Sequence, residues 1–288
     1  MLVLSAGHGR VARAIAGALV QVPLPKRLGL VKLAAASGFP AQFDLATPGL
    51  ATPGDRARLL DGASELVLVP TFDPRVVEQQ AALAAIAPAC GVRAIHFVST
   101  AGADARSPVT LLRWLGLIER AIVATGLPHT ILHCTPYMQS IPLFLRRGAQ
   151  GWRLVGPFRD AAFAWLDAAD AGAALARRIA SPRADASMVC QLSGPEAVPF
   201  ERVAGLLAER LQEPVRYVDV CLPEAVGLLE ANGIPPALVR ALTEYWDFLV
   251  SGVVEAGCCD GGERLLGRAP RALADYLRGF ATELRSAA

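Results

Sequence analysis

Residues close to the N-terminus of the 288-residue chain have the spacing of a phosphate-binding turn. Gly7, Gly9 and Ala12 match the pattern G-x-G-x-x-[GA], directly after an apolar run and directly before an amphipathic helical pattern. The first glycine permits a tight bend, the second lets the backbone approach a pyrophosphate, and the small third residue lets the helix pack on the sheet. Free N–H groups and the helix dipole stabilise the negative charge. The pattern favours dinucleotide binding, and a glycine-rich turn without a ligand is the alternative.

Hydroxyl and imidazole groups at the ends of predicted strands are the candidates for acid–base chemistry. Ser99 and Thr100 end one apolar run, and His133 and Tyr137 stand at the end of another. A positioned hydroxyl or imidazole passes a proton to a substrate oxygen, so the catalytic candidates are Tyr137, Ser99 and His133. The alternatives are an aromatic wall for Tyr137, a turn-capping hydroxyl for Ser99 and a structural histidine for His133.

These residues lie on a chain in which strand-like and helical patterns alternate. Predicted strands precede the Gly7 turn and span residues 28–31, 41–45, 65–70, 94–98 and 130–134, with predicted helices between them, among them 56–60, 76–87 and 109–125. Strands and helices that alternate at this spacing form parallel βαβ units with right-handed crossovers. The predicted fold class is therefore α/β, with a doubly wound parallel Rossmann sheet.

The last part of the chain has a different pattern. It comprises predicted strands over 163–167, 187–192 and 215–220, a predicted helix that ends at 178, and predicted helices over 200–211, 223–232, 236–252 and 269–284. We expect residues 1–150 to form the dinucleotide-binding domain, with its sheet continued by 160–192. Residues 195–288 are expected to form a smaller, mostly helical lobe, with the substrate cleft between the two units.

Ligands of a doubly wound sheet bind at the carboxyl ends of its strands. The predicted cofactor-binding residues stand at these ends: Gly7, His8, Gly9, Arg10, Val11, Pro70, Thr71, Phe72, Ser99, Thr100 and Thr135. The charges near the second strand are all basic, and we add Arg27 and Lys32 because a cation favours a ribose 2′-phosphate. This favours NADP, with NAD as the alternative cofactor and a solvated basic loop as the alternative role of these residues.

Charge and hydropathy argue against two classes of partner. The net charge is +2, only 19% of residues are charged, and no basic cluster is interleaved with aromatic residues, so nucleic acid is not expected. The mean hydropathy of +0.39 comes largely from alanine, and no charge-free apolar run reaches about 18 residues, so we expect no membrane span. The chain starts in a strand rather than in a signal peptide, which favours a cytoplasmic protein.

Other conspicuous side chains are expected to be structural. The six cysteines show neither a C-x-x-C pair nor zinc-ligand spacing, so we expect free thiols and no metal. Four aromatic residues are expected to pack in the core, with the lining of an apolar substrate pocket as the alternative: Trp152, Trp165, Tyr245 and Trp246. Trp246 is the strongest candidate for the pocket. Asp167 and Asp170 precede a predicted helix, whose free N–H groups a carboxylate would cap.

Short motifs along nearly the whole chain resemble, in order and spacing, those of the NmrA-like family of atypical short-chain dehydrogenases/reductases. They include Thr71-Phe72-Asp73-Pro74, Ser99-Thr100-Ala101-Gly102, Gly126-Leu127-Pro128, Leu166-Asp167-Ala168-Ala169-Asp170, Ser193-Gly194-Pro195-Glu196 and Arg264-Leu265-Leu266-Gly267-Arg268. The resemblance implies a Rossmann domain that binds NAD(P), together with a C-terminal lobe. It implies either a reductase of quinones, imines or other unsaturated small molecules, or a nicotinamide-sensing regulator without turnover.

The chain departs from the pattern of this family at positions that matter for the chemistry. The usual TGxxGxxG start becomes SAGHGRVA over residues 5–12, and the usual Arg-Pro-Gly after the sixth strand becomes His133-Cys134-Thr135. The Tyr-x-x-x-Lys pair of typical short-chain dehydrogenases is absent, because the only lysines are Lys26 and Lys32 and no tyrosine precedes Tyr137. Carbonyl reduction by that pair is therefore excluded. A quinone, enone or iminium group accepts hydride from a nicotinamide with little acid assistance.

We therefore expect an NAD(P)H-dependent reductase of a small apolar unsaturated substrate. The missing tyrosine–lysine pair also suits an NAD(P)H-sensing protein that binds a partner protein and turns nothing over. The expected ligands are NADP, or alternatively NAD, and a small molecule. A homodimer or a protein partner is compatible with either hypothesis.

Overall fold

Seven strands in the described part of the chain form one parallel sheet. The computed structural model describes residues 1–6, 9–30, 38–46, 52–71, 73–181, 186–231, 233–252 and 258–287. The strands of this sheet are β1 (Leu2–Ala6), β2 (Lys26–Leu30), β3 (Phe43–Ala46), β4 (Glu65–Leu68), β5 (Ala94–Thr100), β6 (His129–Cys134) and β10 (Met188–Leu192). Their order is β10-β6-β5-β4-β1-β2-β3, in which the chain winds outward on both sides of β1. This order confirms the predicted doubly wound Rossmann fold.

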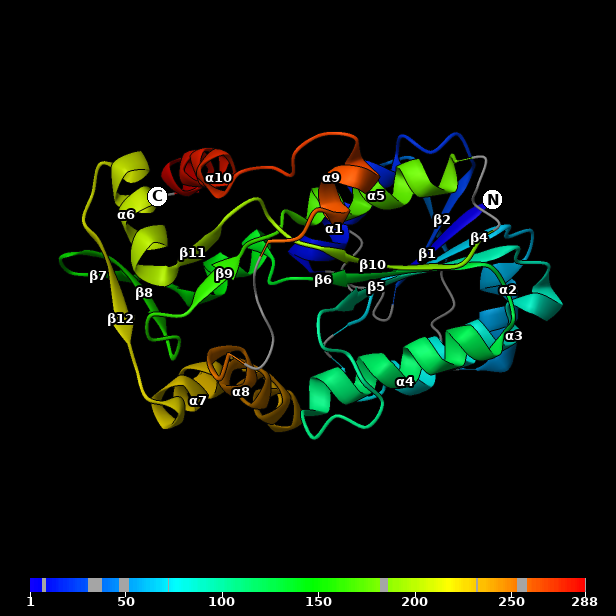
Figure 1. The fold of residues 1–288 in the computed structure, drawn as a ribbon, viewed down its shortest axis with the longest axis horizontal. Coiled ribbons are helices and arrows are strands. Elements are labelled where there is room, and N and C mark those ends of the chain that lie inside the picture. The colour runs from blue at the N-terminus through cyan, green and yellow to red at the C-terminus, as the bar shows by residue number, and fades with distance from the viewer. Residues whose placement is uncertain are drawn as a thin grey trace.

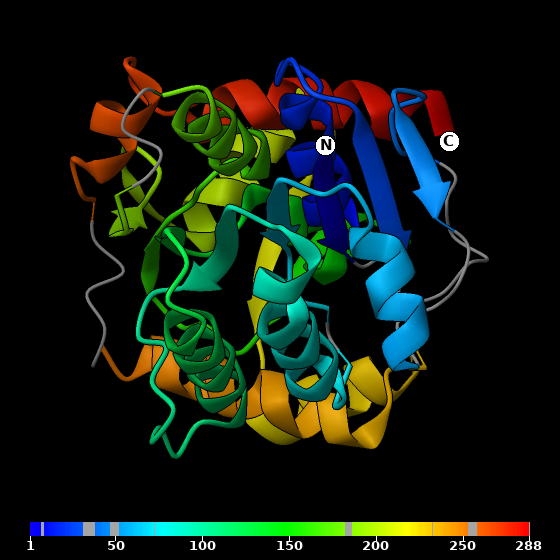
Figure 2. The ribbon, with the colours of Figure 1, turned by 90° about the vertical axis from the view of Figure 1, so that its right-hand side faces the viewer.

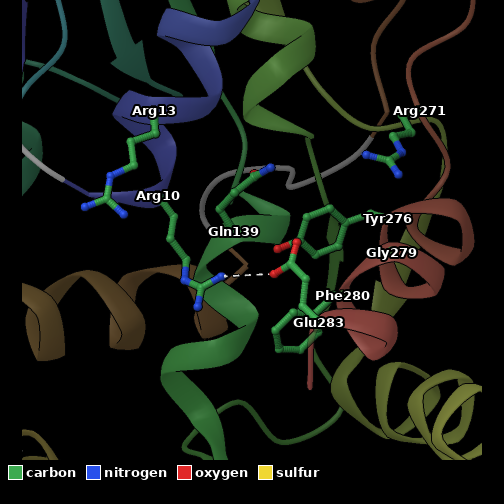
Figure 3. A pocket seen from close by; sticks show the side chains of 8 residues that line it. All are labelled: Arg10, Arg13, Gln139, Arg271, Tyr276, Gly279, Phe280 and Glu283. Atoms are coloured by element: carbon green, nitrogen blue, oxygen red, sulfur yellow. Dashed lines mark ion pairs between the residues drawn. The ribbon is translucent and has the colours of Figure 1, made fainter. Parts of the chain in front are cut away.

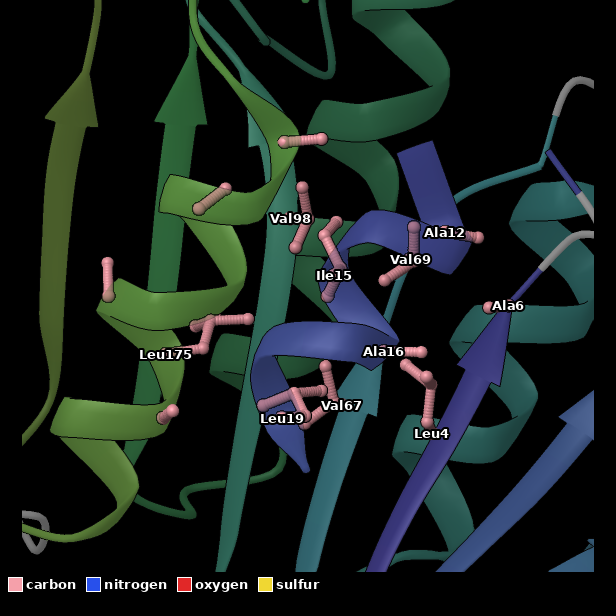
Figure 4. Close-up of a cluster of buried hydrophobic side chains, with 14 of the residues drawn as sticks. Leu4, Ala6, Ala12, Ile15, Ala16, Leu19, Val67, Val69, Val98 and Leu175 are labelled. Atoms are coloured by element: carbon pink, nitrogen blue, oxygen red, sulfur yellow. The ribbon is translucent and has the colours of Figure 1, made fainter. Parts of the chain in front are cut away.

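Helices cover both faces of this sheet (Figures 1 and 2). One face carries α1 (Arg10–Leu19) and α5 (Ala168–Ile179), and the other carries α2 (Pro53–Leu60), α3 (Val76–Ile86) and α4 (Thr110–Ala124). Because side chains alternate along a strand, Leu2 and Leu4 of β1 pack in the core under α1, whereas Val3 packs in the opposite core. Figure 4 shows Ile15 of α1 and Leu175 of α5 in the first of these cores. Burial on both faces explains why the strands are continuous apolar runs.

A second unit, which we call the lobe, lies beyond the carboxyl ends of the strands (Figure 1). Its described elements are η3 (Met138–Phe144), β7 (Leu145–Gly148), β8 (Gly151–Gly156), β9 (Ala162–Ala164), β11 (Ala197–Pro199), α6 (Phe200–Leu211), β12 (Val215–Asp219), α7 (Leu222–Ala231), α8 (Pro236–Val250) and α10 (Leu273–Ala287). Two short helices lie outside it, η2 (Pro88–Cys90) after α3 and α9 (Gly261–Leu266) against α5 and β10. The sequence patterns do not predict β7, β8 or α9.

Aromatic rings form the centre of the lobe's core. The rings of Phe158 and Phe200 are stacked with their centroids 4.4 Å apart, and the Trp246 ring lies 5.7 Å from that of Phe158. Phe144 meets both phenylalanine rings edge to face. Trp246 is therefore a core residue rather than the pocket residue that the sequence favours, and its neighbour Tyr245 reaches the large sheet instead.

Two buried carboxylates, one at the N-cap of α5 and one in its first turn, fix the segment that leads into α10. Asp167 is the N-cap of α5, as predicted, and accepts hydrogen bonds from Ala169 N at 2.9 Å, Gln139 Nε2 at 2.7 Å and Arg271 Nη1 at 2.9 Å. Asp170 accepts a hydrogen bond from the backbone N–H of Arg271 at 2.7 Å. These contacts attach the C-terminal helix of the lobe to the helical layer of the large sheet.

Candidate functional site

The N-terminus of α1 is open. Gly9 is its N-cap residue, no side chain of the described residues caps the helix, and its first turn contains no acidic residue. A Cβ added at Gly9 would meet no described atom within 4 Å. The first N–H groups of the helix, which include those of Arg10 and Val11, therefore point to a place where an anion can bind. The predicted residues Gly7 and His8 lie outside the described residues.

Three buried hydroxyl groups follow the same edge of the sheet. They belong to Ser5 near the end of β1, Thr71 after β4 and Tyr137 after β6, and none has a nitrogen or oxygen partner within the described ranges. A buried hydroxyl without a partner costs about 1–3 kcal/mol, which the polar atoms of a ligand would offset. Pro70, which precedes Thr71, is half-buried, and Phe72 lies outside the described residues.

Burial keeps the Tyr137 phenol protonated. Loss of solvation raises the pKa of the Tyr137 hydroxyl well above its ordinary value of 10, and the neighbouring Cys134 thiol adds to this effect. Burial likewise raises the pKa of the Cys134 thiol to about 12. Tyr137 is therefore a hydrogen-bond donor, and not a phenolate, at neutral pH.

Tyr245 of α8 reaches the same edge of the sheet from the lobe. The sequence alone does not decide whether this side chain packs in the core or lines a pocket. Its hydroxyl lies 3.1 Å from Thr100 Oγ1, which itself donates a hydrogen bond to the Cys134 carbonyl oxygen at 3.0 Å. Because a threonine hydroxyl has a single hydrogen, Tyr245 donates to Thr100. The charge of Tyr245 also contributes, as the smallest of the causes, to the raised pKa of Tyr137.

Ser99 and His133, two of the predicted catalytic residues, are directed toward α4 instead of the open edge. The Ser99 hydroxyl donates a hydrogen bond to Glu119, and His133 Nε2 lies 3.0 Å from the same carboxylate oxygen. This geometry gives both residues a positioning role and does not support a catalytic one. Glu119 is not among the predicted site residues, although its spacing from Leu115 and Ile122 places a charge on the apolar face of α4, where it needs a polar partner.

The positions of Arg27 and Thr135 correct the predicted cofactor site. Arg27 lies at the amino end of β2, opposite to the ligand-binding edge, and its guanidinium donates hydrogen bonds to carbonyl groups at the end of α2. Lys26 is likewise engaged by carbonyl groups that precede β2. Thr135 is buried and its hydroxyl donates to the Ala164 carbonyl oxygen. Lys32 lies outside the described residues.

A hollow of about 440 Å³ lies beside the N-terminus of α1, between this helix and α10 (Figure 3). It is lined by Arg10, Arg13, Gln139, Arg271, Tyr276, Gly279, Phe280 and Glu283. The Arg10 guanidinium lies 3.8 Å from the Glu283 carboxylate, and both side chains are largely exposed, so this ion pair is weak. With three arginines and one glutamate, the lining is basic.

The described ranges contain neither a metal-ligand cluster nor a membrane-spanning helix. No three side chains of the His, Cys, Asp and Glu types gather there as a metal site requires. None of the helices in these ranges has the length and apolar character needed to cross a membrane.

Comparison with known proteins relates the chain to nicotinamide-binding proteins. No family model matches it. It is 25% identical over 290 residues, the full length of both chains, to an NAD(P)H azoreductase from Xenophilus azovorans. Its structure matches the NADPH-dependent quinone oxidoreductase QOR2 of Escherichia coli, solved with NADPH, at a TM-score of 0.79 and 21% identity over 97% of this chain and 99% of that chain. The negative transcriptional regulator NmrA, solved with NAD, matches at a TM-score of 0.75 and 19% identity over 99% of this chain and 97% of that chain.

Proposed function

We propose that this chain, which has the NAD(P)-binding Rossmann fold that its resemblance to the NmrA-like family implies, is an NAD(P)H-dependent reductase of a small apolar unsaturated molecule. The observation that carries the proposal is a row of three buried hydroxyl groups beside the open N-terminus of α1, those of Ser5, Thr71 and Tyr137, which have no nitrogen or oxygen partner among the described residues. The full-length similarity to an azoreductase supports reductive chemistry. A quinone, enone or imine suits the site, because each accepts hydride with little acid assistance.

The residues at this edge fit a dinucleotide. The N–H groups of Arg10 and Val11 and the open space at Gly9 suit a pyrophosphate. The hydroxyl groups of Thr71 and Tyr137 suit the polar atoms of the nicotinamide half and of a substrate. When bound, the nicotinamide supplies the hydride. NADP is the proposed cofactor, and NAD is the alternative.

Tyr137 is the proposed proton donor. Its hydroxyl meets no nitrogen or oxygen partner among the described residues, so it is available to donate a hydrogen bond, and then its proton, to a substrate oxygen or nitrogen. The proton of Tyr245 is already engaged by Thr100, so this second phenol orients the strand end and walls the pocket. Glu119 binds Ser99 and thereby holds the end of β5 against α4.

Two measurements test the proposed function. Titration of the purified protein with NADPH and NADH, followed by tryptophan fluorescence, tests cofactor binding, and dissociation constants above about 1 mM for both would contradict it. Oxidation of NADPH in the presence of simple quinones, cyclic imines and azo dyes tests turnover. Oxidation faster than that of NADPH without an acceptor supports the reductase.

The second candidate function is an NAD(P)H-sensing regulator that binds a protein partner. It is favoured by the absence of the Tyr-x-x-x-Lys pair and by the structural match to NmrA. Tight cofactor binding without turnover of any acceptor in the panel would favour this function over the reductase.

A further inference from the structure

Of the two cations predicted to contact a ribose 2′-phosphate, Arg27 lies away from the ligand-binding edge, and Lys32 lies outside the described residues. Lys26 and Arg27 are engaged by backbone carbonyl groups on the amino side of the sheet. In a doubly wound fold the adenosine ribose lies at the opposite side, near the carboxyl end of β2, next to β1 and the start of α1. A cation that reads the 2′ position must therefore reach this side.

Arg13 reaches it from α1. It lies one turn after the open N-terminus of this helix and packs against Gly38, in the connection between β2 and β3. A Cβ added at Gly38 would lie 3.1 Å from Nε and 3.3 Å from Cζ of Arg13, so the guanidinium rests on backbone that carries no side chain. The φ of +85° at Gly38 is one that glycine adopts without strain. The guanidinium thus lies between the first turns of α1 and the β2–β3 connection.

One nitrogen of the Arg13 guanidinium is also without a partner in the described ranges. This atom, Nε, is buried. Arg10, by contrast, is paired with Glu283, and Figure 3 shows the Arg10 guanidinium turned toward Glu283 and that of Arg13 turned away from it. A partly desolvated cation without a counter-charge is unfavourable, and a phosphate would supply both the charge and the acceptor oxygens.

We propose that Arg13 binds the adenosine 2′-phosphate and makes the chain select NADPH over NADH. A planar guanidinium donates two parallel hydrogen bonds to a phosphate, whereas the 2′-hydroxyl of NADH leaves the charge unpaired. The inference rests on the proposed function, since it assumes that the dinucleotide binds at the open N-terminus of α1.

The experiment compares ligands that differ only at the 2′ position. Calorimetry measures the binding of two ligand pairs to the parent protein, to Arg13→Gln and to Arg13→Lys. The first pair is NADPH and NADH, and the second is adenosine 2′,5′-bisphosphate and 5′-AMP. Loss of charge-assisted hydrogen bonds should raise the dissociation constant of NADPH in Arg13→Gln by about 10- to 100-fold. The dissociation constant of NADH should change by less than about 2-fold. Arg13→Lys keeps the charge but not the planar fork, so its dissociation constant for NADPH should lie between those of the parent and of Arg13→Gln.

Arg27→Gln serves as the control and should leave the ratio of the NADH and NADPH dissociation constants unchanged. Lys32→Gln tests the competing assignment of the 2′-phosphate to Lys32. The Arg13 inference is overturned if Arg13→Gln weakens both dinucleotides equally or neither of them, or if Lys32→Gln removes the selectivity. Equal affinity of the parent for NADPH and NADH also overturns it, while the proposed function stands. If the parent binds neither dinucleotide, the proposed function fails and the inference fails with it. Thermal unfolding of each variant shows whether it is folded.

Discussion

Removal of the Tyr137 hydroxyl group tests whether this residue serves catalysis or stability. In the described part of the chain this buried hydroxyl meets no nitrogen or oxygen partner and only the weakly accepting Cys134 thiol, so its removal costs little hydrogen-bond energy. We expect Tyr137→Phe to keep or raise the melting temperature of the protein, while the turnover rate with the best acceptor falls by at least about 10-fold. Thermal unfolding and steady-state kinetics on one sample measure both effects.

Tyr217→Phe is the matched control for this prediction. The Tyr217 hydroxyl lies 2.8 Å from the Gly156 carbonyl oxygen and accepts a hydrogen bond from Phe158 N at 3.0 Å. Its removal should lower the free energy of unfolding by about 1–3 kcal/mol and leave the turnover rate unchanged. A destabilised but fully active Tyr137→Phe protein would argue against Tyr137 as the proton donor.

Cys134 determines part of the alkaline stability. Its thiol has a pKa of about 12 in the folded chain because it is buried, against an ordinary value of 9. Above pH 9 the unfolded chain loses a proton that the folded chain retains, so the free energy of unfolding falls as the pH rises from 9 toward 12. In Cys134→Ala the melting temperature should therefore fall less between about pH 8 and about pH 10.5 than in the parent. Cys221→Ala, at an exposed position, should behave like the parent, and a parent-like slope in Cys134→Ala would refute the assignment.

At the residue scale, the sequence predicts which residues stand near a strand but not always which end they occupy. Arg27 is close in sequence to the end of β2, yet a strand of five residues spans about 17 Å, and Arg27 lies at its amino end. Tyr245 reaches Thr100 from far along the chain, and no local pattern encodes such a contact. Gly9, in contrast, is predictable because both the strand before it and the helix after it are local patterns.

At the scale of elements, α1 carries two glycines that have similar space around them and different roles. A Cβ added at Gly9 or at Gly17 would meet no described atom within 4 Å. Leucine at position 9 would occupy the approach of a pyrophosphate to the helix, so we expect Gly9→Leu to fold and to bind NADPH at least about 10-fold more weakly. Fluorescence titration and thermal unfolding measure the two properties.

Gly17→Leu is the control on the same helix. It should bind NADPH as the parent does and raise the stability by about 0.5–1 kcal/mol, because glycine inside a helix is unfavourable. Equal effects of the two substitutions on binding would mean that the dinucleotide does not bind at the N-terminus of α1.

The strands and helices of the large sheet are predictable because each is apolar or amphipathic by itself. The β7–β8 hairpin is not, since its sequence, LRRGAQGWRLVG, has no clear alternation and its partner β12 is distant in the chain. The same holds for α9, which contains the poor helix formers Gly261 and Gly262. A Cβ at Gly261 would lie 2.2 Å from the Gln191 carbonyl oxygen, so this glycine is required by close packing against β10 and not by local structure.

At the scale of the whole molecule, Asp167 joins the two units. Its carboxylate is buried and binds donors of α5, η3 and the segment before α10. Asp167→Ala leaves these donors without their acceptor, and the free energy of unfolding should fall by about 2–4 kcal/mol. Urea unfolding measures the change. Asp260→Ala, which breaks an exposed ion pair with Arg264 at 2.8 Å, should cost less than about 0.5 kcal/mol, and similar costs for the two variants would contradict the role of Asp167.

The path of the chain through the two units has a consequence for its biosynthesis. The chain forms six strands of the large sheet, enters the lobe from η3 to β9, returns for α5 and β10, and leaves again for α6. Phe144 and Phe158 therefore emerge from the ribosome well before Phe200 and Trp246, the residues that bury them. Neither unit is complete until most of the chain has been translated. During that interval the nascent chain exposes aromatic surface, which is what chaperones recognise.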